Sequence, residues 1–456
     1  TIGATDKSIE LKGMKLQKSL DRQPIMASKD ADAEQGLATE ELLESARDIA
    51  REGPICDHCL GRQFAKIASG LSNERRGEIL RAALAERGGE LKRGKCWVCN
   101  GLFEQLDAWV SRALETLKDY EFESFLVGTK VSGLLLENED LLWEIAGAVH
   151  AEPLKAELNR EVGKRIERET GKRAEFDAPE LVVVLNLQTE SVEVQSNAIF
   201  VYGRYLKFER GIPQTRWFCR ACRGKGCERC NFTGKMYPES VEELISGSLL
   251  ELFHGEEMVL HGCGREDIDA CMLGSGRPFV LELKEPQRRY VDLRAAEEIV
   301  NAENAGKIKV FDLHYVKKGL VAELKSANAE KTYQATVEIK TLGVIDEIVL
   351  KNALDALSGA MIEQRTPTRV AHRRADLVRK RKVATARLVS FTATVEARRA
   401  VIELKCDAGL YVKELVSGDA GRTKPSLSAM LGLEVEVTDL DVVDVDLNLP
   451  VQDYYF

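Results

Sequence analysis

The sequence lacks the long apolar runs and the nucleotide-binding motifs that mark several large classes of protein. No stretch reaches the roughly eighteen consecutive apolar residues of a membrane-spanning helix, and the start shows no charged-then-apolar signal peptide. The glycine-rich motif GxGxxG after a strand, the phosphate-binding motif GxxxxGK[ST] and the zinc-protease motif HExxH are all missing. We therefore expect a cytoplasmic protein with no membrane partner and no organic cofactor.

Length and charge limit the number of domains and the kinds of partner. At 456 residues the chain is too long for one ordinary hydrophobic core, which predicts several domains. A net charge of −9 argues mildly against a nucleic-acid partner. Residues 365–387 run against this balance, with nine Lys and Arg and a single acid, Asp376. Such a stripe suits a polyanion, although a solvated basic helix or a mobile loop would have the same composition.

Cysteines are clustered rather than scattered. Eight of the eleven fall in four CxxC pairs: Cys56/Cys59, Cys96/Cys99, Cys219/Cys222 and Cys227/Cys230. Thiols stay reduced inside cells, so two such pairs predict a four-thiolate structural zinc site, with a redox dithiol or an iron–sulfur cluster as the alternatives. CRACRGKGCERC is too short to bury a core, so a metal would have to hold it. We interpret His58, inside the first pair, as a bystander.

The hydrophobic periodicity predicts an α+β protein of several domains. We expect a disordered tail over residues 1–38, a helical metal-binding segment over 39–119, an α+β module over 120–212 and a four-cysteine hairpin over 213–238. Over 239–456, short predicted strands alternate with helices, which favours a large, mainly antiparallel sheet.

The stretch GCGREDIDACMLGSGRPFV, residues 262–280, places charged side chains on a loop between two predicted strands. A carboxylate on such a loop can bind a metal, cap a turn or attack a substrate. Asp267 and Asp269 are both candidates, and the glycines Gly274 and Gly276 are expected to serve the turn before the second strand.

Several motifs together resemble one enzyme family. GRED resembles the catalytic loop of pseudouridine synthases, KTYQATVEI resembles the motif that presents a Tyr to the target base, and AGLYVKEL resembles the motif that supplies a basic residue. Further matching motifs are ICDHCLGRQFA, FLVGTKV, YGRYLKFERGIPQTRW, QRTPTRVAHRRA and GDAGRTKPS. With these motifs included, the chain after residue 39 is similar to the tenth family of tRNA pseudouridine synthases, which acts on the TΨC arm in archaea and eukaryotes. Cys271 and Leu410 stand where that family's pattern has Arg and Thr.

This resemblance implies a zinc-bearing, THUMP-like accessory region followed by a pseudouridine synthase domain that acts on tRNA uridine 54, 55 or both. It implies Asp267 as the catalytic carboxylate and Lys413 as the cation beside it. It also implies Tyr333 stacking on the uracil, Arg265 holding the gap left by the flipped nucleotide, and Leu440 as an apolar wall. The alternatives are a core aromatic for Tyr333 and a surface lysine for Lys413.

The basic block gains a role from the same resemblance. Its cations would contact tRNA phosphates, which position an RNA without reading its sequence. The residues concerned are Arg365, Arg369, Arg373, Arg374, Arg379, Lys380, Arg381 and Lys382. We expect a monomer. Rival functions are another THUMP-bearing tRNA modifier, whose cofactor loop is missing from the sequence, and an RNA-binding zinc protein without activity.

Overall fold

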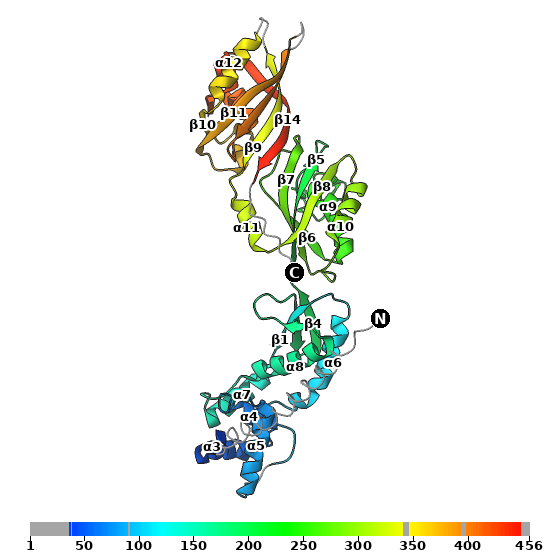
Figure 1. The fold of residues 1–456 in the computed structure, drawn as a ribbon, viewed down its shortest axis with the longest axis vertical. Coiled ribbons are helices and arrows are strands. Elements are labelled where there is room, and N and C mark those ends of the chain that lie inside the picture. The colour runs from blue at the N-terminus through cyan, green and yellow to red at the C-terminus, as the bar shows by residue number, and fades with distance from the viewer. Residues whose placement is uncertain (1–35, 38, 90–91, 341–345, 394–397, 448–456) are drawn as a thin grey trace, which may run out of the picture. The chain divides into compact units, whose positions relative to one another are not determined.

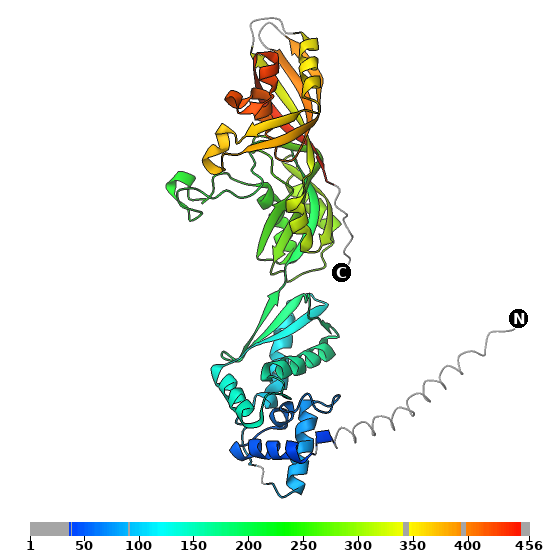
Figure 2. The ribbon, with the colours of Figure 1, turned by 90° about the vertical axis from the view of Figure 1, so that its left-hand side faces the viewer.

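The computed structural model describes residues 36–37, 39–89, 92–340, 346–393 and 398–447. It divides into two units, Thr1–Asn197 and Ala198–Phe456, each with a core of its own (Figures 1 and 2). The predicted multidomain α+β class is confirmed. The tail expected over residues 1–38 lies almost wholly outside the described residues.

The first unit begins with helices whose apolar faces pack together. These are α3 (Glu40–Glu52), α4 (Asp57–Arg62), α5 (Asn73–Glu86) and α6 (Leu106–Leu117), the last preceded by η1 (Leu102–Gln105). The hydroxyl of Ser72 accepts a hydrogen bond from the Arg75 amide, which caps the start of α5. Leu43, Ala46, Ile49 and Ala50 are buried on the inner face of α3, at the three- and four-residue spacings of one helix face.

A four-stranded sheet completes the first unit. Its elements are β1 (Ser124–Lys130), α7 (Gly133–Ala146), α8 (Leu154–Thr170), β2 (Arg173–Ala174), β3 (Leu181–Asn186) and β4 (Ser191–Ser196). The strand order is β2-β1-β3-β4, in which β1 is parallel to both neighbours and β3 pairs antiparallel with β4. One hydrophobic core continues from the helices into this sheet, so the two halves of the unit stabilise each other.

The second unit is built on a ten-stranded sheet. Its strands are β5 (Ile199–Lys207), β6 (Glu257–Gly262), β7 (Cys271–Lys284), β8 (Ile308–Val316), β9 (Glu330–Lys340), β10 (Met361–Arg365), β11 (Val378–Ala393), β12 (Arg398–Cys406), β13 (Thr423–Lys424) and β14 (Glu434–Asp446). The order is β13-β10-β11-β12-β9-β14-β7-β5-β8, with β6 also on β7. Among the described residues of this unit only the β7–β14 pairing is parallel, so the prediction of a mainly antiparallel sheet is confirmed.

Helices cover both ends of this sheet (Figure 1). The helices of this unit are η2 (Glu228–Cys230), which lies in the four-cysteine hairpin, α9 (Val241–Phe253), α10 (Leu293–Glu303), α11 (Gly319–Ser326), α12 (Glu347–Leu357), η3 (Thr368–Arg373), α13 (Val412–Ser417), η4 (Asp419–Gly421) and α14 (Leu427–Leu431). Helices α9 and α10 pack against β6 and β8, and α12 packs against β11. The result is two hydrophobic cores along one sheet.

Three segments differ from the sequence-based expectation. Strand β5, expected within the module over 120–212, pairs with β7 and β8 in the second unit. Tyr202 and Tyr205 are buried there, and no local pattern in the sequence states which distant strands a buried strand will join.

The second difference is the basic block. A solvated basic helix or a mobile loop was the alternative for residues 365–387, but β11 begins at Val378. Pairing with β10 and β12 satisfies its backbone, which outweighs the cost of a highly charged strand.

The third difference concerns the glycines. Gly274 and Gly276 lie inside β7 rather than in a turn before it, and both have the left-handed backbone that favours glycine, with φ of 58° and 69°. A Cβ on Gly274 would stand 1.8 Å from the carbonyl oxygen of Val443 in β14. The glycine therefore allows the close approach of β7 and β14.

Candidate active site

The site lies where the two cores of the second unit meet. Strands β7 and β14 share only two paired positions there, Asp441 with Cys271 and Val442 with Met272. Tyr333 of β9 packs against both cores. A cavity of about 300 Å³ opens at this junction, which we call the central cavity. Its lining includes Arg265, Asp267, Lys331, Tyr333, Arg369, Arg374, Arg379, Arg381, Tyr411, Lys413 and Leu440.

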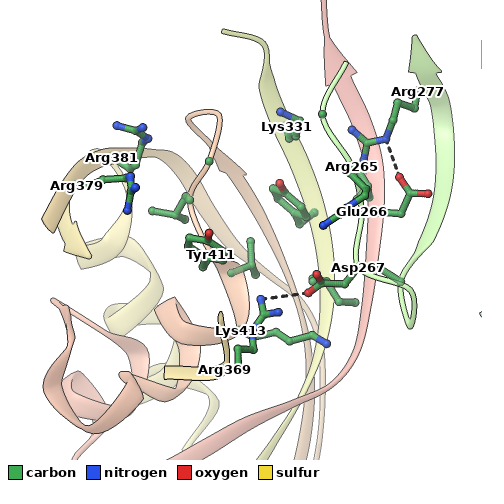
Figure 3. Close-up of a pocket in the computed structure, with 18 of the residues that line it drawn as sticks. Arg265, Glu266, Asp267, Arg277, Lys331, Arg369, Arg379, Arg381, Tyr411 and Lys413 are labelled. Atoms are coloured by element: carbon green, nitrogen blue, oxygen red, sulfur yellow. Dashed lines mark hydrogen bonds and ion pairs between the residues drawn. The ribbon is translucent and has the colours of Figure 1, made fainter. Parts of the chain in front are cut away.

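The loop between β6 and β7 directs neighbouring side chains in opposite directions (Figure 3). Glu266 points inward, is 6% exposed and forms an ion pair of 2.7 Å with Arg277, which is 1% exposed. The hydroxyl of Tyr205 donates to the same carboxylate, and the amide of Gln214 donates to both Tyr205 and the carbonyl of Gly264. This buried network anchors the loop and leaves Asp267 facing the cavity.

Arg369, from η3, is the cation that contacts Asp267. Its Nη2 lies 3.2 Å from Oδ2 of Asp267, while its Nε donates to Glu414 at 2.6 Å and its guanidinium lies over the Tyr411 ring (Figure 3). Burial lowers the pKa of Arg369, but the hydrogen bond to Glu414 and the charges of Glu414 and Asp267 outweigh burial and raise it. A fixed positive charge therefore stands against the Asp267 carboxylate.

Lys413, from α13, lines the cavity but pairs with a different acid. Its Nζ donates to Oδ2 of Asp269 at 2.7 Å, whereas the sequence-based expectation placed it beside Asp267. Burial raises the pKa of Asp269, but the hydrogen bond and charge of Lys413 outweigh it, so this pKa lies below its ordinary value. The acid that was the alternative to Asp267 is thus occupied by Lys413.

Tyr333 and Leu440 form apolar walls of the cavity. Tyr333 lies in the middle of β9, paired with Leu404 on one side and Val442 on the other. Burial raises its pKa to about 12, against the opposing charge of Arg277. The phenol is therefore protonated at neutral pH. Leu440 is 7% exposed, and its carbonyl accepts a hydrogen bond from Arg210, which holds this part of β14 in place.

Arg265 lies at the rim of the cavity. It is exposed, and its guanidinium stands 5.7 Å from the centre of the Trp217 ring. Beyond it a second hollow is lined by Gln214, Arg265, Asp267 and Tyr411 among others, so the rim continues toward the segment after β5.

The predicted phosphate contacts divide between two faces. Alternation along β11 turns Arg379 and Arg381 toward the central cavity and Lys380 and Lys382 toward the opposite face, where Lys380 pairs with Glu363. Arg369 and Arg374 also line the cavity, Arg365 pairs with Asp376, and the side chain of Arg373 lies outside the described residues.

Sequence reasoning missed the residues that support the site. It named neither the Glu266–Arg277 pair nor Lys331, which lines the cavity with a pKa lowered by burial and by the charge of Arg277. A signal was present, because Glu266 lies inside GRED and Tyr205 inside YGRYLKF, two motifs that carried the resemblance.

Two four-cysteine clusters have the geometry of metal sites. In each, the four sulfurs lie within 4.8 Å of one another, and the groups are Cys56, Cys59, Cys96, Cys99 and Cys219, Cys222, Cys227, Cys230. The sulfurs of Cys56 and Cys99 in the first cluster stand 3.6 Å apart, and three sulfur pairs of the second cluster stand 3.7 to 3.9 Å apart. Zinc with four sulfurs at about 2.3 Å gives tetrahedron edges of about 3.8 Å, so both clusters fit zinc.

The surroundings of the first cluster are also those of a metal site. Arg62 donates to the sulfur of Cys59 at 2.9 Å, as an outer-shell partner does. His58 pairs instead with Glu157 at 2.8 Å and stacks on Phe103, which accounts for it without a metal.

No helix among the described residues has the length and apolar character needed to cross a membrane.

Both units are similar to proteins of known families. Residues 200–446 match the family model described as Pus10, C-terminal, and residues 109–186 match the Pus10 THUMP domain, archaeal. The tRNA pseudouridine synthase Pus10 of Methanothrix thermoacetophila is 48% identical over 434 residues, covering 89% of this chain and 94% of the relative. The Pus10 of Halorubrum lacusprofundi is 43% identical and covers 89% and 96%.

A solved Cbf5-Nop10-Gar1 complex contains a chain that is 14% identical, with a TM-score of 0.28, over 53% of this chain and 48% of that one. At this score the likeness adds nothing to the assignment. The two family models and the extent of the identity with curated relatives show that the chain belongs to the Pus10 family of tRNA pseudouridine synthases.

Proposed function

We propose that this enzyme converts uridine to pseudouridine in the TΨC arm of tRNA, at position 54, 55 or both, with Asp267 as the catalytic carboxylate. One observation supports this most strongly. Arg265, Asp267, Tyr333, Lys413 and Leu440, which the sequence analysis selected, all line the central cavity. Arg265 and Asp267 share the loop between β6 and β7, whereas Tyr333, Lys413 and Leu440 come from β9, α13 and β14. The family membership gives the cavity a substrate.

The reaction requires little beyond positioned polar groups. The C1′–N1 bond of uridine breaks and a C1′–C5 bond forms, while C5 loses a proton and N1 gains one, so no electrons are exchanged and no redox cofactor is needed. Asp267 would attack C1′ or remove the 2′ proton. Arg369, at 3.2 Å, would hold the carboxylate in position, and Lys413 would hold the neighbouring Asp269 and add positive charge near the reacting sugar.

The apolar part of the cavity suits a uracil taken out of its stack. Tyr333 would lie against the base, and Leu440 would close the other side. Because its pKa is about 12, the Tyr333 phenol carries a proton at neutral pH. It would therefore act at C5 only as a relay, in which its oxygen takes up the proton that C5 loses while its own proton passes to an acceptor. Arg265, exposed at the rim, would fill the place that the flipped nucleotide leaves.

The cations around the cavity would hold the phosphates beside that nucleotide. Arg374, Arg379 and Arg381 line it directly, which gives binding that weakens steeply with salt. Lys380 and Lys382 would reach other phosphates from the opposite face. Zinc in the two four-cysteine clusters would stabilise the local fold and take no part in the chemistry. We further propose that the enzyme works in the cytoplasm as a monomer.

An unmodified tRNA transcript provides the test. Incubation with the enzyme, followed by carbodiimide-probed primer extension, should place a stop in the T arm at position 54, 55 or both. Asp267→Asn should abolish the stop, and Asp355→Asn, an exposed aspartate on α12, should leave it unchanged. Equal stops for wild type and Asp267→Asn would remove Asp267 from the reaction, and no stop with the wild type would favour an RNA-binding zinc protein.

A further inference from the structure

The central cavity contains a buried lysine whose charge no acid balances. Lys331, on β9, is 9% exposed and lines the cavity together with Gly264 and Arg277. Among the described residues its ammonium forms no ion pair, and its one hydrogen bond runs to the carbonyl of Ala329 at 3.4 Å. An ammonium has three hydrogens to donate, so most of this capacity is left for a molecule that enters the cavity.

The other buried cations around the catalytic loop have partners. Lys207 is fully buried, but its Nζ donates to the carbonyls of Ile212 at 2.8 Å and Ile268 at 3.2 Å. Arg277 pairs with Glu266 at 2.7 Å. Burying a charge without a partner is costly, so a group left in this state within a cavity is a candidate for function.

The groups around Lys331 disfavour its positive charge. Burial lowers its pKa, the charge of Arg277 lowers it further, and the Cys263 thiol acts in the opposite direction. A Cβ on Gly264 would stand 3.4 Å from Nη1 of Arg277 and 3.6 Å from Nζ of Lys331, so both cations border the same small residue. A ligand atom that carries negative charge would relieve this repulsion.

The position of Lys331 on β9 directs it toward a bound base. It lies two residues before Tyr333, and alternate residues of a strand face the same side of the sheet. Figure 3 shows its side chain extending from β9 beside the loop that carries Arg265 and Glu266. A base that lies against Tyr333 therefore has an edge within reach of the ammonium.

We propose that Lys331 is a further catalytic residue, whose ammonium donates a hydrogen bond to a carbonyl oxygen of the flipped uracil. The inference rests on the proposed function, which places that base in the central cavity. When the C1′–N1 bond breaks, its electron pair leaves with the base, and the negative charge spreads over N1, O2 and O4. A fixed cation beside one of these oxygens stabilises the charge as it develops, while its own protons stay on nitrogen.

The same donor would serve the base after it turns. The C1′–C5 bond forms only when C5 takes the place of N1, which a half-turn about the line through N3 and C6 achieves. That half-turn also exchanges O2 with O4. A carbonyl oxygen therefore faces Lys331 before and after the turn, and one cation stabilises both orientations of the detached base.

Single-turnover conversion of a tRNA transcript, followed by chromatography of the digested nucleosides, tests the proposal. Lys331→Met should lower the rate about a hundredfold, as loss of one such donor does. The Kd for tRNA should change by less than about threefold, because the charge develops only during the reaction. Lys331→Arg should recover most of the rate. Lys284→Met, which removes an exposed lysine that pairs with Glu257, is the matched control and should change neither quantity.

Thermal unfolding separates this role from a structural one. Lys331→Met removes a buried charge without a partner, so the variant should unfold at the wild-type temperature or above it while it loses activity. A variant that loses stability together with activity would assign Lys331 to the fold and overturn the proposal.

Sulfur in place of one carbonyl oxygen tests the contact itself. Transcripts would carry 2-thiouridine or 4-thiouridine at the uridine that the wild type converts, since sulfur is the weaker hydrogen-bond acceptor. One of the two should slow the wild type about tenfold and leave the rate of Lys331→Met nearly unchanged, because that variant has no donor to lose.

Two results would overturn the contact. They are equal slowing of both proteins by each sulfur substitution, and conversion by Lys331→Met at the wild-type rate. A wild type that converts no uridine would instead contradict the proposed function, so the two failures remain distinguishable.

Discussion

At the scale of single residues, the site depends on two adjacent acids that face opposite ways. Glu266 is buried in an ion pair with Arg277, and Asp267 faces the cavity and Arg369. The first acid gives the loop one position, and the second acid lines the cavity in which the proposed function places the ribose. A reactive carboxylate on an exposed loop needs such an anchor, because a displacement of about 1 Å is enough to cost much of the rate.

Removing the anchor should be costly. Glu266→Gln leaves the charge of Arg277 buried and without its partner, so we expect the free energy of unfolding of the second unit to fall by about 3–5 kcal/mol. Denaturant unfolding measures this. Glu347→Gln, which breaks an exposed pair with Lys351 on α12, is the control and should leave stability nearly unchanged. A loss no larger than the control's would show that the buried pair does not fix the loop.

The phenol of Tyr333 should make stability depend on pH. Its folded pKa of about 12 lies above the ordinary value near 10, so folding favours the protonated form. The corresponding stability is fully present below pH 10 and is lost as pH rises toward 12, by about 2–3 kcal/mol at most. Between pH 10 and 12 the free energy of unfolding should therefore fall more for the wild type than for Tyr333→Phe. An equal fall for both proteins would mean that the ring is solvated.

At the scale of elements, the short parallel pairing of β7 and β14 controls the shape of the cavity. It requires glycine at 274, where φ is 58° and a Cβ would overlap the Val443 carbonyl. The strand therefore bends at the place where its neighbour carries Leu440 and Val442 into the cavity wall.

A methyl group at that bend should disturb both stability and activity. We expect Gly274→Ala to destabilise the second unit by about 2 kcal/mol or more, because the strained backbone and the clash add. Gly247→Ala is the matched control, since this helical glycine of α9 has open space around it and should gain about 0.5–1 kcal/mol. Thermal unfolding of both variants decides the point, and equal effects would contradict the clash.

Metal removal should affect the hairpin more than the cavity. Elemental analysis should find about two zinc per chain, and Cys222→Ser/Cys230→Ser should lower this to about one. Because the hairpin buries almost nothing, the thermal transition of the second unit should move little. Retention of two zinc ions by this variant would contradict the assignment of the four ligands.

At the scale of the whole molecule, local signals were predictable and long-range partners were not. CxxC spacing predicts a metal site because two thiols so close in sequence can bind one ion, and GRED identifies its loop through its own glycine and acids. In contrast, Arg369 contacts Asp267 from 102 positions away, whereas we expected Lys413 there. The strands joined by β5, and the division of β11 between two faces, likewise depend on pairings with distant parts of the chain.

Release of hydrogen from C5 of uracil is the most direct measurement of the central claim. Joining C1′ to C5 expels that hydrogen, so tRNA transcripts tritiated at C5 should release one tritium to water for each uridine converted. We predict release by the wild type and by Asp355→Asn, and a rate lower by a factor on the order of a thousand or more for Asp267→Asn. Release from Asp267→Asn at the wild-type rate would contradict a reaction carried by this carboxylate.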